Sequence, residues 1–213
     1  MLQEAWRGLV ELLAPPACAA CGSALEARED AFCPGCAVLI DEFPCIAESE
    51  DRAACVYGGP IAEAITRLKY RGHSHHAHAL AGLLVAAAEP WVDCVDRVCV
   101  VPLHRSRLTE RGYNQSALLA WPVARAVGAR FDPGLLVRAK ATGTQVGADP
   151  GTRRKQLRGA FRAARRAQGL RILVVDDVRT TGATLAEARR ALGEVGAQRV
   201  YTLTVAASTA DPG

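Results

Sequence analysis

Residues 172–184 read ILVVDDVRTTGAT, and this stretch decides the expected fold more than any other part of the chain. Its first four residues form an uninterrupted, mostly β-branched apolar run, which is typical of a strand covered on both faces in a parallel sheet. Two carboxylates, Asp176 and Asp177, follow at the carboxyl end of this strand, where open α/β sheets bind their ligands. The stretch therefore predicts an α/β fold with a ligand site at this edge of the sheet.

A threonine-rich loop joins the strand to a predicted helix. Apolar residues recur with helical spacing at Leu185, Ala188, Leu192 and Val195. The loop thus precedes a helix N-terminus, where backbone N–H groups, the helix dipole and hydroxyl groups together attract an anion. The residues expected to hold a phosphate are Thr180, Thr181, Gly182, Ala183 and Thr184.

The two aspartates require a different ligand group. Ionised carboxylates only accept hydrogen bonds, so Asp176 and Asp177 suit the hydroxyl groups of a ribose or a magnesium ion close to it. The alternative is a buried strand followed by an acidic turn and a threonine helix cap, with no ligand, because these residue types are common in turns and caps. The combination of all these features favours a phosphosugar site.

Four cysteines near the N-terminus form two C-x-x-C pairs with eleven residues between them: Cys18, Cys21, Cys33 and Cys36. Two such pairs supply the four thiolates of a tetrahedral, closed and structural zinc site, which would fold a segment too small to bury its own core. Unrelated free thiols and a redox pair are the alternatives, but neither pair lies in the βαβ context of redox motifs. Cys94 and Cys99 flank a predicted strand, and both are expected to be buried.

The chain divides into two expected domains. Residues 1–52 would form an amphipathic N-terminal helix and a zinc ribbon, and residues 53–213 an α/β domain. In the second domain, strands are expected at 54–57, 97–103, 171–175 and 200–206, and helices at 61–70, 75–89, 114–127 and 185–195. Pro122 is expected to disturb the third helix. This alternation predicts a mostly parallel sheet flanked by helices.

Composition limits the class of protein. The net charge of +4 is small, but residues 153–171 hold eight basic and no acidic residues, which indicates either a solvated face or a contact with a polyanion. No stretch reaches the 18 apolar residues expected of a membrane span. Charged residues interrupt the N-terminal apolar run, unlike in a secretory signal, so we expect a cytoplasmic protein.

Several motifs, taken in order, carry a resemblance to a known family. Residues 172–184 resemble the phosphoribosyl-pyrophosphate signature of type I phosphoribosyltransferases. The chain as a whole resembles the ComF family, whose members are phosphoribosyltransferase-like proteins associated with DNA uptake competence. The resemblance rests on the cysteine ribbon, Lys-Tyr-x-Gly at 69–72, VPL at 101–103, RGYNQ at 111–115, TxTQ at 142–145, GAF at 159–161 and VVDDVRTTGAT at 174–184. RGYNQ and the ribbon distinguish it from purine and orotate phosphoribosyltransferases.

The resemblance implies a type I phosphoribosyltransferase-like domain with a small N-terminal zinc ribbon, and it implies roles for particular residues. Asp176 and Asp177 would hold the ribose of phosphoribosyl pyrophosphate, which binds with magnesium. Arg105 and Arg111, whose guanidinium groups suit phosphate oxygens, would lie near the pyrophosphate, and Lys69 would add a positive charge. Residues 142–151 would form a lid that excludes water.

A second hypothesis from the same resemblance is a non-catalytic competence factor that binds single-stranded DNA. The basic residues of 153–171 would then contact the DNA backbone, and a competence helicase would be a further partner. The two hypotheses make different predictions, because DNA binding depends on the basic residues and phosphosugar binding on the two aspartates.

Overall fold

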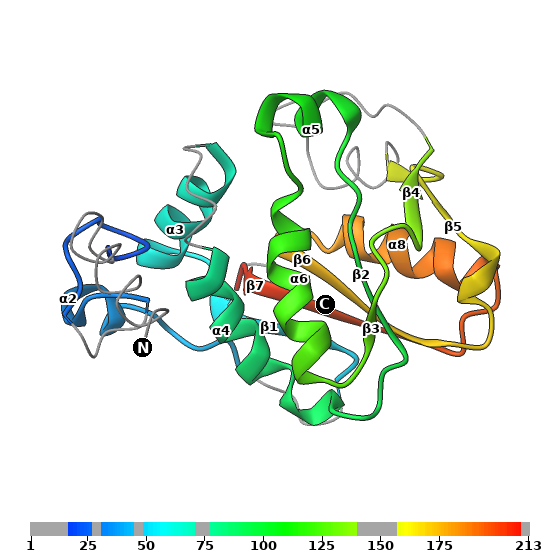
Figure 1. The fold of residues 1–213 in the computed structure, drawn as a ribbon, viewed down its shortest axis with the longest axis horizontal. Coiled ribbons are helices and arrows are strands. Elements are labelled where there is room, and N and C mark those ends of the chain that lie inside the picture. The colour runs from blue at the N-terminus through cyan, green and yellow to red at the C-terminus, as the bar shows by residue number, and fades with distance from the viewer. Residues whose placement is uncertain (1–16, 27–30, 45–48, 71–76, 140–156, 210–213) are drawn as a thin grey trace, which may run out of the picture.

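The computed structural model describes residues 17–26, 31–44, 49–70, 77–139 and 157–209. Its centre is a sheet of five parallel strands (Figure 1). In spatial order these are β1 (Asp51–Val56), β7 (Arg199–Ala207), β6 (Arg171–Arg179), β2 (Arg97–Val100) and β3 (Arg130–Phe131). The expected mostly parallel α/β fold is thus confirmed.

Strand β6 is covered on both faces, as its sequence predicts. Leu173 and Val175 belong to one hydrophobic cluster, together with apolar residues of the helices on that side. Ile172 and Val174 belong to a second cluster on the other face. All four side chains are fully buried, because successive residues of a strand point to opposite faces of the sheet.

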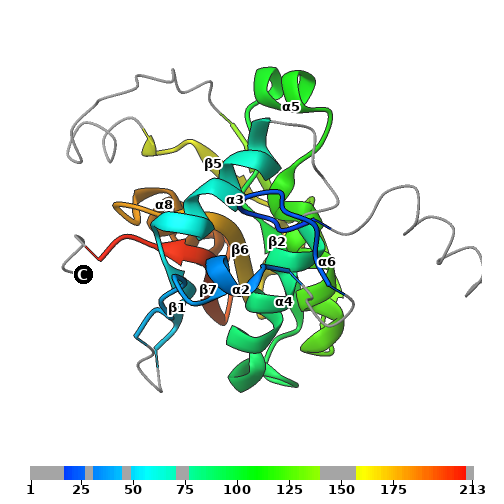
Figure 2. The same cartoon turned by 90° about the vertical axis from the view of Figure 1, so that its left-hand side faces the viewer.

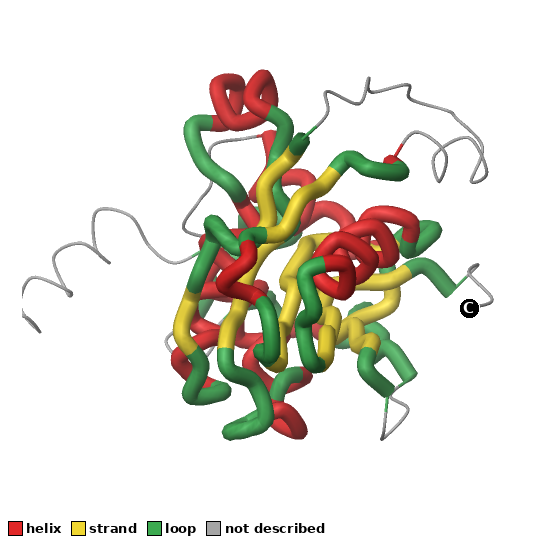
Figure 3. The backbone as a smooth tube through the Cα atoms, turned by 90° about the vertical axis from the view of Figure 1, so that its right-hand side faces the viewer, coloured by secondary structure: helices red, strands yellow, loops and turns green. Residues whose placement is uncertain are grey.

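Helices occupy both sides of the sheet. Helices α4 (Ala77–Ala87) and α6 (Gln115–Ala126) lie on one face, and α8 (Ala183–Glu194) lies on the other (Figure 2). The antiparallel pair β4 (Leu136–Arg138) and β5 (Phe161–Ala163) packs beside α8 (Figure 3). The other helices of the described segments are α2 (Pro34–Ala37), α3 (Gly59–Tyr70), η2 (Glu89–Trp91), α5 (Arg105–Arg111) and η3 (Arg165–Ala167).

The sheet reverses its order between β2 and β6. From β2 the chain proceeds to β3 on one side, whereas β6, on the other side of β2, proceeds to β7 in the opposite direction. In open α/β sheets, ligands bind outside the carboxyl ends of the strands at such a switch point. The topology thus puts the segments after β2 and β6 at the expected ligand site.

Some local expectations are wrong. Strand β6 does not end at Val175 but continues to Arg179, because Val178 and Arg179 still pair with Ala206 and Ala207 of β7. Residues 105–111, which lie outside the expected strands and helices, form helix α5 with His104 as its N-cap. Helix α6 runs through Pro122 as one continuous helix.

Other expectations concern two cysteines and two segments that lie outside the described residues. Cys99 is fully buried as expected, but Cys94 is exposed, because it lies in the turn after η2 rather than on the strand. The predicted N-terminal helix and the predicted lid at 142–151 lie outside the described residues. Among the described residues, no helix combines the length and the apolar character needed to cross a membrane.

An ion pair links the starts of the two central strands. Asp96, just before β2, accepts hydrogen bonds at Oδ2 from the backbone N–H of Arg171 at 2.8 Å and from its Nε at 3.2 Å. Its Oδ1 accepts from Arg171 Nη2 at 2.8 Å, which completes a bidentate pair. These hydrogen bonds lower the pKa of Asp96 from 3.8 to about 2. Asp96 thus fixes the register at which β6 enters the sheet.

We expect this pair to make stability depend on pH in the acid range. A lowered folded-state pKa means that the contribution is complete above pH 4 and is lost as the pH falls toward 2. Asp96→Asn should reduce the unfolding free energy at pH 7 by about 1 kcal/mol, since both side chains are partly exposed. Denaturant unfolding at several pH values measures this, and an unchanged acid slope in Asp96→Asn would refute it.

Candidate functional site

Asp176 and Asp177, here called the acid pair, lie on β6 at the switch point of the sheet. Asp177 is only 5% exposed. Burying a carboxylate is costly unless it is paired or hydrogen-bonded. The partners of both carboxylates therefore identify the residues that build this site.

Asp177 has partners from two different helices. Its Oδ1 forms an ion pair with Lys69 Nζ at 2.8 Å, and Lys69 lies in the last turn of α3. Its Oδ2 accepts a hydrogen bond from Gln115 Nε2 at 2.8 Å, and Gln115 is the first residue of α6. The structure thus brings Lys69, expected from the sequence only as a nearby charge, into direct contact with the acid pair.

Asp176 has one well-partnered oxygen. Its Oδ1 accepts from Ser116 Oγ and from the backbone N–H of Asp177, both at 3.0 Å. Burial, followed by the negative charge of Asp177, raises the pKa of Asp176 to about 7, and Lys69 and both hydrogen bonds act against this rise. Its Oδ2 accepts no hydrogen bond from any described residue. This oxygen is therefore the one at which the acid pair can accept a further hydrogen bond.

The RGYNQ motif builds the frame around the acid pair. Asn114 caps α6 by accepting from the Ser116 N–H at 3.0 Å, and its Nδ2 donates to the carbonyl of Val101, just after β2, at 3.1 Å. Arg111 Nη1 donates to Gln115 Oε1 at 3.0 Å. This contact orients the Gln115 amide so that its NH₂ group faces Asp177. Arg111 thus connects to the acid pair through Gln115.

The loop of residues 180–184, here called the threonine loop, follows β6 and enters α8. Thr180 is exposed, Thr181 and Thr184 are partly exposed, and Ala183 is buried as the first residue of α8. Gly182 is the N-cap and has a φ of 66°, in the left-handed region. The loop therefore supplies threonine hydroxyl groups next to a helix N-terminus, where the first N–H groups have no partner within the helix.

Replacement of Gly182 should show how strongly the loop depends on this backbone conformation. A Cβ in the left-handed region costs about 1 to 2 kcal/mol, so Gly182→Ala should lower the unfolding free energy by about that amount. Gly193→Ala is the matched control, because Gly193 lies inside α8 with open space around it and alanine stabilises helix interiors. Equal stability changes in the two variants, measured by denaturant unfolding, would contradict this account of the loop.

The basic residues after β2 behave differently from one another. Arg107 pairs with Glu110 at 2.9 Å on the surface of α5. His104 Nδ1 accepts the Ser106 N–H at 3.3 Å and so caps α5. Arg105 opens α5, but its side chain lies outside the described part. Only Arg111 is connected to the acid pair among the described side chains of this segment.

The four predicted zinc ligands come together. The Sγ atoms of Cys18, Cys21, Cys33 and Cys36, here called the cysteine cluster, all lie within 4.8 Å of one another. The Sγ atoms of Cys21 and Cys33 are 3.7 Å apart. Tetrahedral zinc with Zn–S bonds of about 2.3 Å requires sulfur atoms about 3.8 Å apart. The cluster thus fits a structural zinc site.

Backbone hydrogen bonds preform the two cysteine knuckles. Gly22 N–H donates to the Cys18 carbonyl at 3.0 Å, and Cys36 N–H donates to the Cys33 carbonyl at 2.9 Å. Gly22 has a φ of 81°, which suits a tight turn that only glycine adopts readily. These turns explain why each pair is separated by two residues.

Sequence reasoning missed two contributors to the site. Ser116 supplies a direct hydrogen bond to Asp176, yet a single serine after the RGYNQ motif carries no sequence signal. Tyr113 donates from its hydroxyl to the Leu68 carbonyl of α3 at 2.6 Å, whereas the sequence shows it only as a member of the RGYNQ motif. Both contacts join residues far apart in the chain.

Comparison with known proteins agrees with this architecture. A family model described as "Phosphoribosyl transferase domain" matches residues 114–212. The "DNA utilization protein YhgH" of Salmonella typhimurium is 38% identical over 149 residues, which cover 68% of this chain and 66% of that protein's own length. "Competence protein F" of Haemophilus influenzae is 28% identical over 213 residues, covering 86% of this chain and 93% of that protein.

Solved structures include proteins with some similarity to this chain. One is an adenine phosphoribosyltransferase from Thermoanaerobacter pseudethanolicus, with 14% identity and a TM-score of 0.40 over 63% of this chain and 82% of that one.

Proposed function

Because the chain belongs to the ComF family of phosphoribosyltransferase-like proteins, we propose that it binds phosphoribosyl pyrophosphate, or a closely related phosphosugar, together with magnesium. The observation that carries the proposal is the acid pair at the switch point of the sheet, held by Lys69 and Gln115 and followed directly by the threonine loop. This arrangement offers acceptors for hydroxyl groups and donors for a phosphate in one place.

Each part of the site has a separate task in this proposal. The acid pair accepts hydrogen bonds from the ribose hydroxyl groups, chiefly at Asp176 Oδ2. The threonine loop binds the 5-phosphate with its N–H groups and hydroxyls. Arg111, with Arg105, supports the pyrophosphate. Magnesium, when bound, supplies positive charge to the pyrophosphate, and carboxylate oxygens are among the ligands that it prefers.

If the protein transfers the phosphoribosyl group, catalysis is mainly electrostatic and positional. The leaving pyrophosphate carries the charge that develops as its bond to the anomeric carbon breaks, and positive side chains oppose that charge. The frame of Lys69, Gln115 and Ser116 holds the acid pair so that the ribose binds in one orientation. These contacts do not indicate which molecule would accept the phosphoribosyl group.

Competition with two sugar phosphates tests the proposed site. We expect ribose 5-phosphate to displace phosphoribosyl pyrophosphate, and 2-deoxyribose 5-phosphate to bind at least about tenfold more weakly, since it lacks one hydroxyl group that a carboxylate would accept. Displacement titrations monitored by calorimetry measure the affinities of the two sugar phosphates. Equal affinities would contradict a role of the acid pair in ribose recognition.

We also propose that the cysteine cluster binds one structural zinc ion. The sulfur spacing and the preformed knuckles support this proposal. All four ligands come from the protein, so the site has no open position for a substrate. Its contribution would be to fold the described ribbon residues 17–26 and 31–44, here called the cysteine ribbon.

A second candidate function is the binding of single-stranded DNA, with a competence helicase as a further partner. Exposed Arg158, Arg162 and Arg165 favour it, and so do the names of the relatives. Arg166 and Arg171, from the same basic stretch, instead form ion pairs with Asp132 and Asp96. Among the described arginines of this stretch, the second candidate therefore rests on three, and Arg153, Arg154 and Lys155 lie outside the described residues.

Salt dependence tests this second candidate. If the three exposed arginines contact DNA phosphates, a triple alanine variant should bind single-stranded DNA more weakly, and the slope of log affinity against log salt should fall by about two, at roughly 0.7 per phosphate contact. Fluorescence anisotropy with a labelled oligonucleotide measures both. An unchanged slope would show that these arginines do not contact DNA phosphates.

A further inference from the structure

The last turn of α3 contacts both the cysteine ribbon and the acid pair. Three consecutive residues are involved: Arg67, Leu68 and Lys69. Helix α3 lies between the ribbon and the sheet in the structure (Figure 1). Two features that the sequence treats as separate modules are thus connected through a single helical turn.

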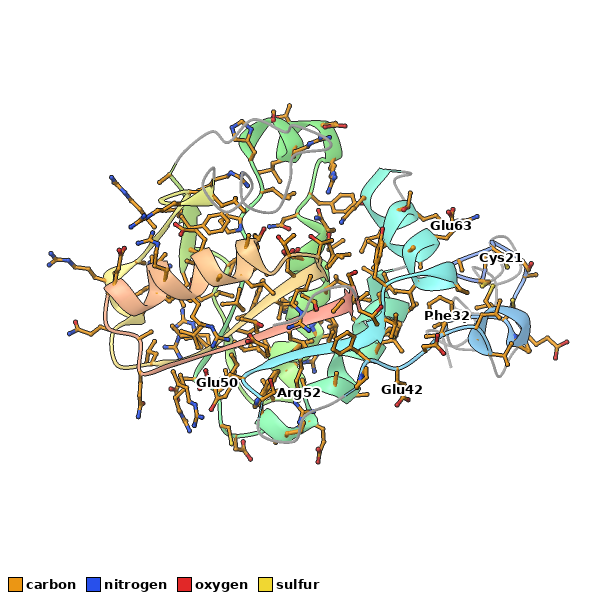
Figure 4. All side chains as sticks on the ribbon, turned by 180° about the vertical axis from the view of Figure 1, so that it is seen from behind. Cys21, Phe32, Glu42, Glu50, Arg52 and Glu63 are labelled. Carbon is orange, nitrogen blue, oxygen red and sulfur yellow. The ribbon has the colours of Figure 1, made fainter. Side chains whose placement is uncertain are left out.

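On the ribbon side, Arg67 packs against the first cysteine knuckle. A Cβ at position 22 would lie 2.9 Å from Arg67 Nη1, so the guanidinium rests directly on the backbone of Gly22. Arg67 is held there by an ion pair with Glu63 at 3.2 Å, one turn earlier in α3. Glu63 and Cys21 lie at the same end of the molecule (Figure 4). The Arg67 side chain therefore packs against the turn that runs from Cys18 to Gly22.

The hydrophobic core of the sheet and helices extends into the first cysteine knuckle. Ala19, between the two cysteines of the first knuckle, is fully buried in the same hydrophobic cluster as Ile65 and Leu68 of α3. Movement of the knuckle would therefore expose apolar surface of the helix as well as of the ribbon. The fold of the ribbon and the position of α3 are coupled by shared burial.

On the other side, two contacts tie the same turn to the acid pair. The Leu68 carbonyl belongs to the last turn of α3, where carbonyl groups have no partner within the helix. Tyr113, from the RGYNQ motif, donates its hydroxyl to this carbonyl at 2.6 Å. Lys69 extends from the next position to Asp177 at 2.8 Å. The helix end, and with it the lysine, is thus held at a fixed distance from α6 and β6.

We propose that the cysteine ribbon is a positioning element of the phosphosugar site, acting through Arg67 on the last turn of α3 and so on Lys69. When the ribbon loses its fold, the turn is released on one side, Lys69 no longer stays on Asp177, and the acid pair loses the cation that offsets its charge. The effect on ligand affinity rests on the proposed function, whereas the effect on Lys69 does not.

Lysine NMR provides a test that does not require a ligand. The chain has three lysines, so protein labelled with ¹⁵N-lysine gives few side-chain signals, and Lys69→Met identifies the one from Lys69. We expect Arg67→Met and Tyr113→Phe each to shift or broaden the Lys69 ammonium signal. Arg125→Met is the matched control, since Arg125 lies over Trp121 on α6, and should leave the signal in place. An unchanged Lys69 signal in Arg67→Met would overturn the proposal.

Ligand affinity provides the second readout. Arg67→Met should weaken binding of phosphoribosyl pyrophosphate about fivefold, but only while Lys69 is present, because neighbours that act through one another are not additive. The double variant Arg67→Met, Lys69→Met should bind no more weakly than Lys69→Met alone. Additive losses would overturn the proposal. Absence of binding by the wild type would instead refute the proposed function and leave the NMR result to decide.

Discussion

Cys33→Ser is expected to abolish stoichiometric zinc binding and to destabilise the protein strongly. Structural zinc sites contribute many kcal/mol to the fold of small domains, and removing one thiolate leaves an incomplete ligand set. Cys33 is also the N-cap of α2, and its Sγ lies 3.7 Å from that of Cys21. We expect the melting temperature to fall by about 10 °C, at roughly 3 °C per kcal/mol for a chain of this length. Metal analysis and thermal unfolding measure the two effects.

An exposed cysteine outside the cluster provides the control. Cys94 is exposed and is not part of the four-sulfur group, so Cys94→Ser should keep one zinc per chain and melt like the wild type. A chelator should lower the melting temperature of the wild type and of Cys94→Ser, and should have little further effect on Cys33→Ser. Retention of full zinc content and stability by Cys33→Ser would exclude the cluster as a structural metal site.

Asp177→Asn is expected to weaken ligand binding strongly, because Asp177 is the residue of the acid pair that anchors the Lys69 and Gln115 side chains. The asparagine amide presents an NH₂ group where one carboxylate oxygen now accepts, so it faces a donor, either Lys69 Nζ or Gln115 Nε2. Gln115 cannot turn its amide around without losing its bond from Arg111. A hydrogen bond to a charged group contributes about 1.5 to 3 kcal/mol, and the lost bond is one of those that hold the acid pair in its binding orientation. We therefore expect the affinity for phosphoribosyl pyrophosphate to fall about tenfold to a hundredfold.

Asp132→Asn is the matched control for this substitution. Asp132 forms an ion pair with Arg166 at 2.9 Å, so the same chemical change there also breaks an ion pair, but away from the acid pair. We expect a small loss of stability and an unchanged dissociation constant. Calorimetry on both variants, with circular dichroism to establish folding, compares them. Similar losses of affinity in the two variants would mean that Asp177 has no specific role.

The fold was predictable where burial alone decides it. The apolar run at 172–175 predicts a doubly covered strand, and the structure confirms this. The strand continues past the acid pair only because β7 still offers partners at Ala206 and Ala207, and a polar sequence after two aspartates gives no sign of that. Helix α5 was missed for a related reason, since its residues RSRLTER lack an apolar face and its cap is the side chain of His104.

The site was predictable only where its residues are close together in the sequence. The acid pair, the threonine loop and the cysteine cluster were proposed from short-range spacing, and the structure brings the four cysteines together. Gln115 and Asp177 are 62 positions apart, and Ser116 and Asp176 are 60 apart, so pairing between them depends on the topology of the sheet. The sequence predicted only that Lys69 adds a positive charge near the site. Its ion pair with Asp177 depends on the position of α3.

The most direct measurement for the central claim is calorimetric titration of the zinc-loaded protein with phosphoribosyl pyrophosphate, with and without magnesium. The double variant Asp176→Asn, Asp177→Asn serves as the comparison. We predict binding to the wild type that strengthens with magnesium and is absent in the folded double variant. No binding to the folded wild type, or equal binding to the variant, would contradict a phosphosugar site at the acid pair.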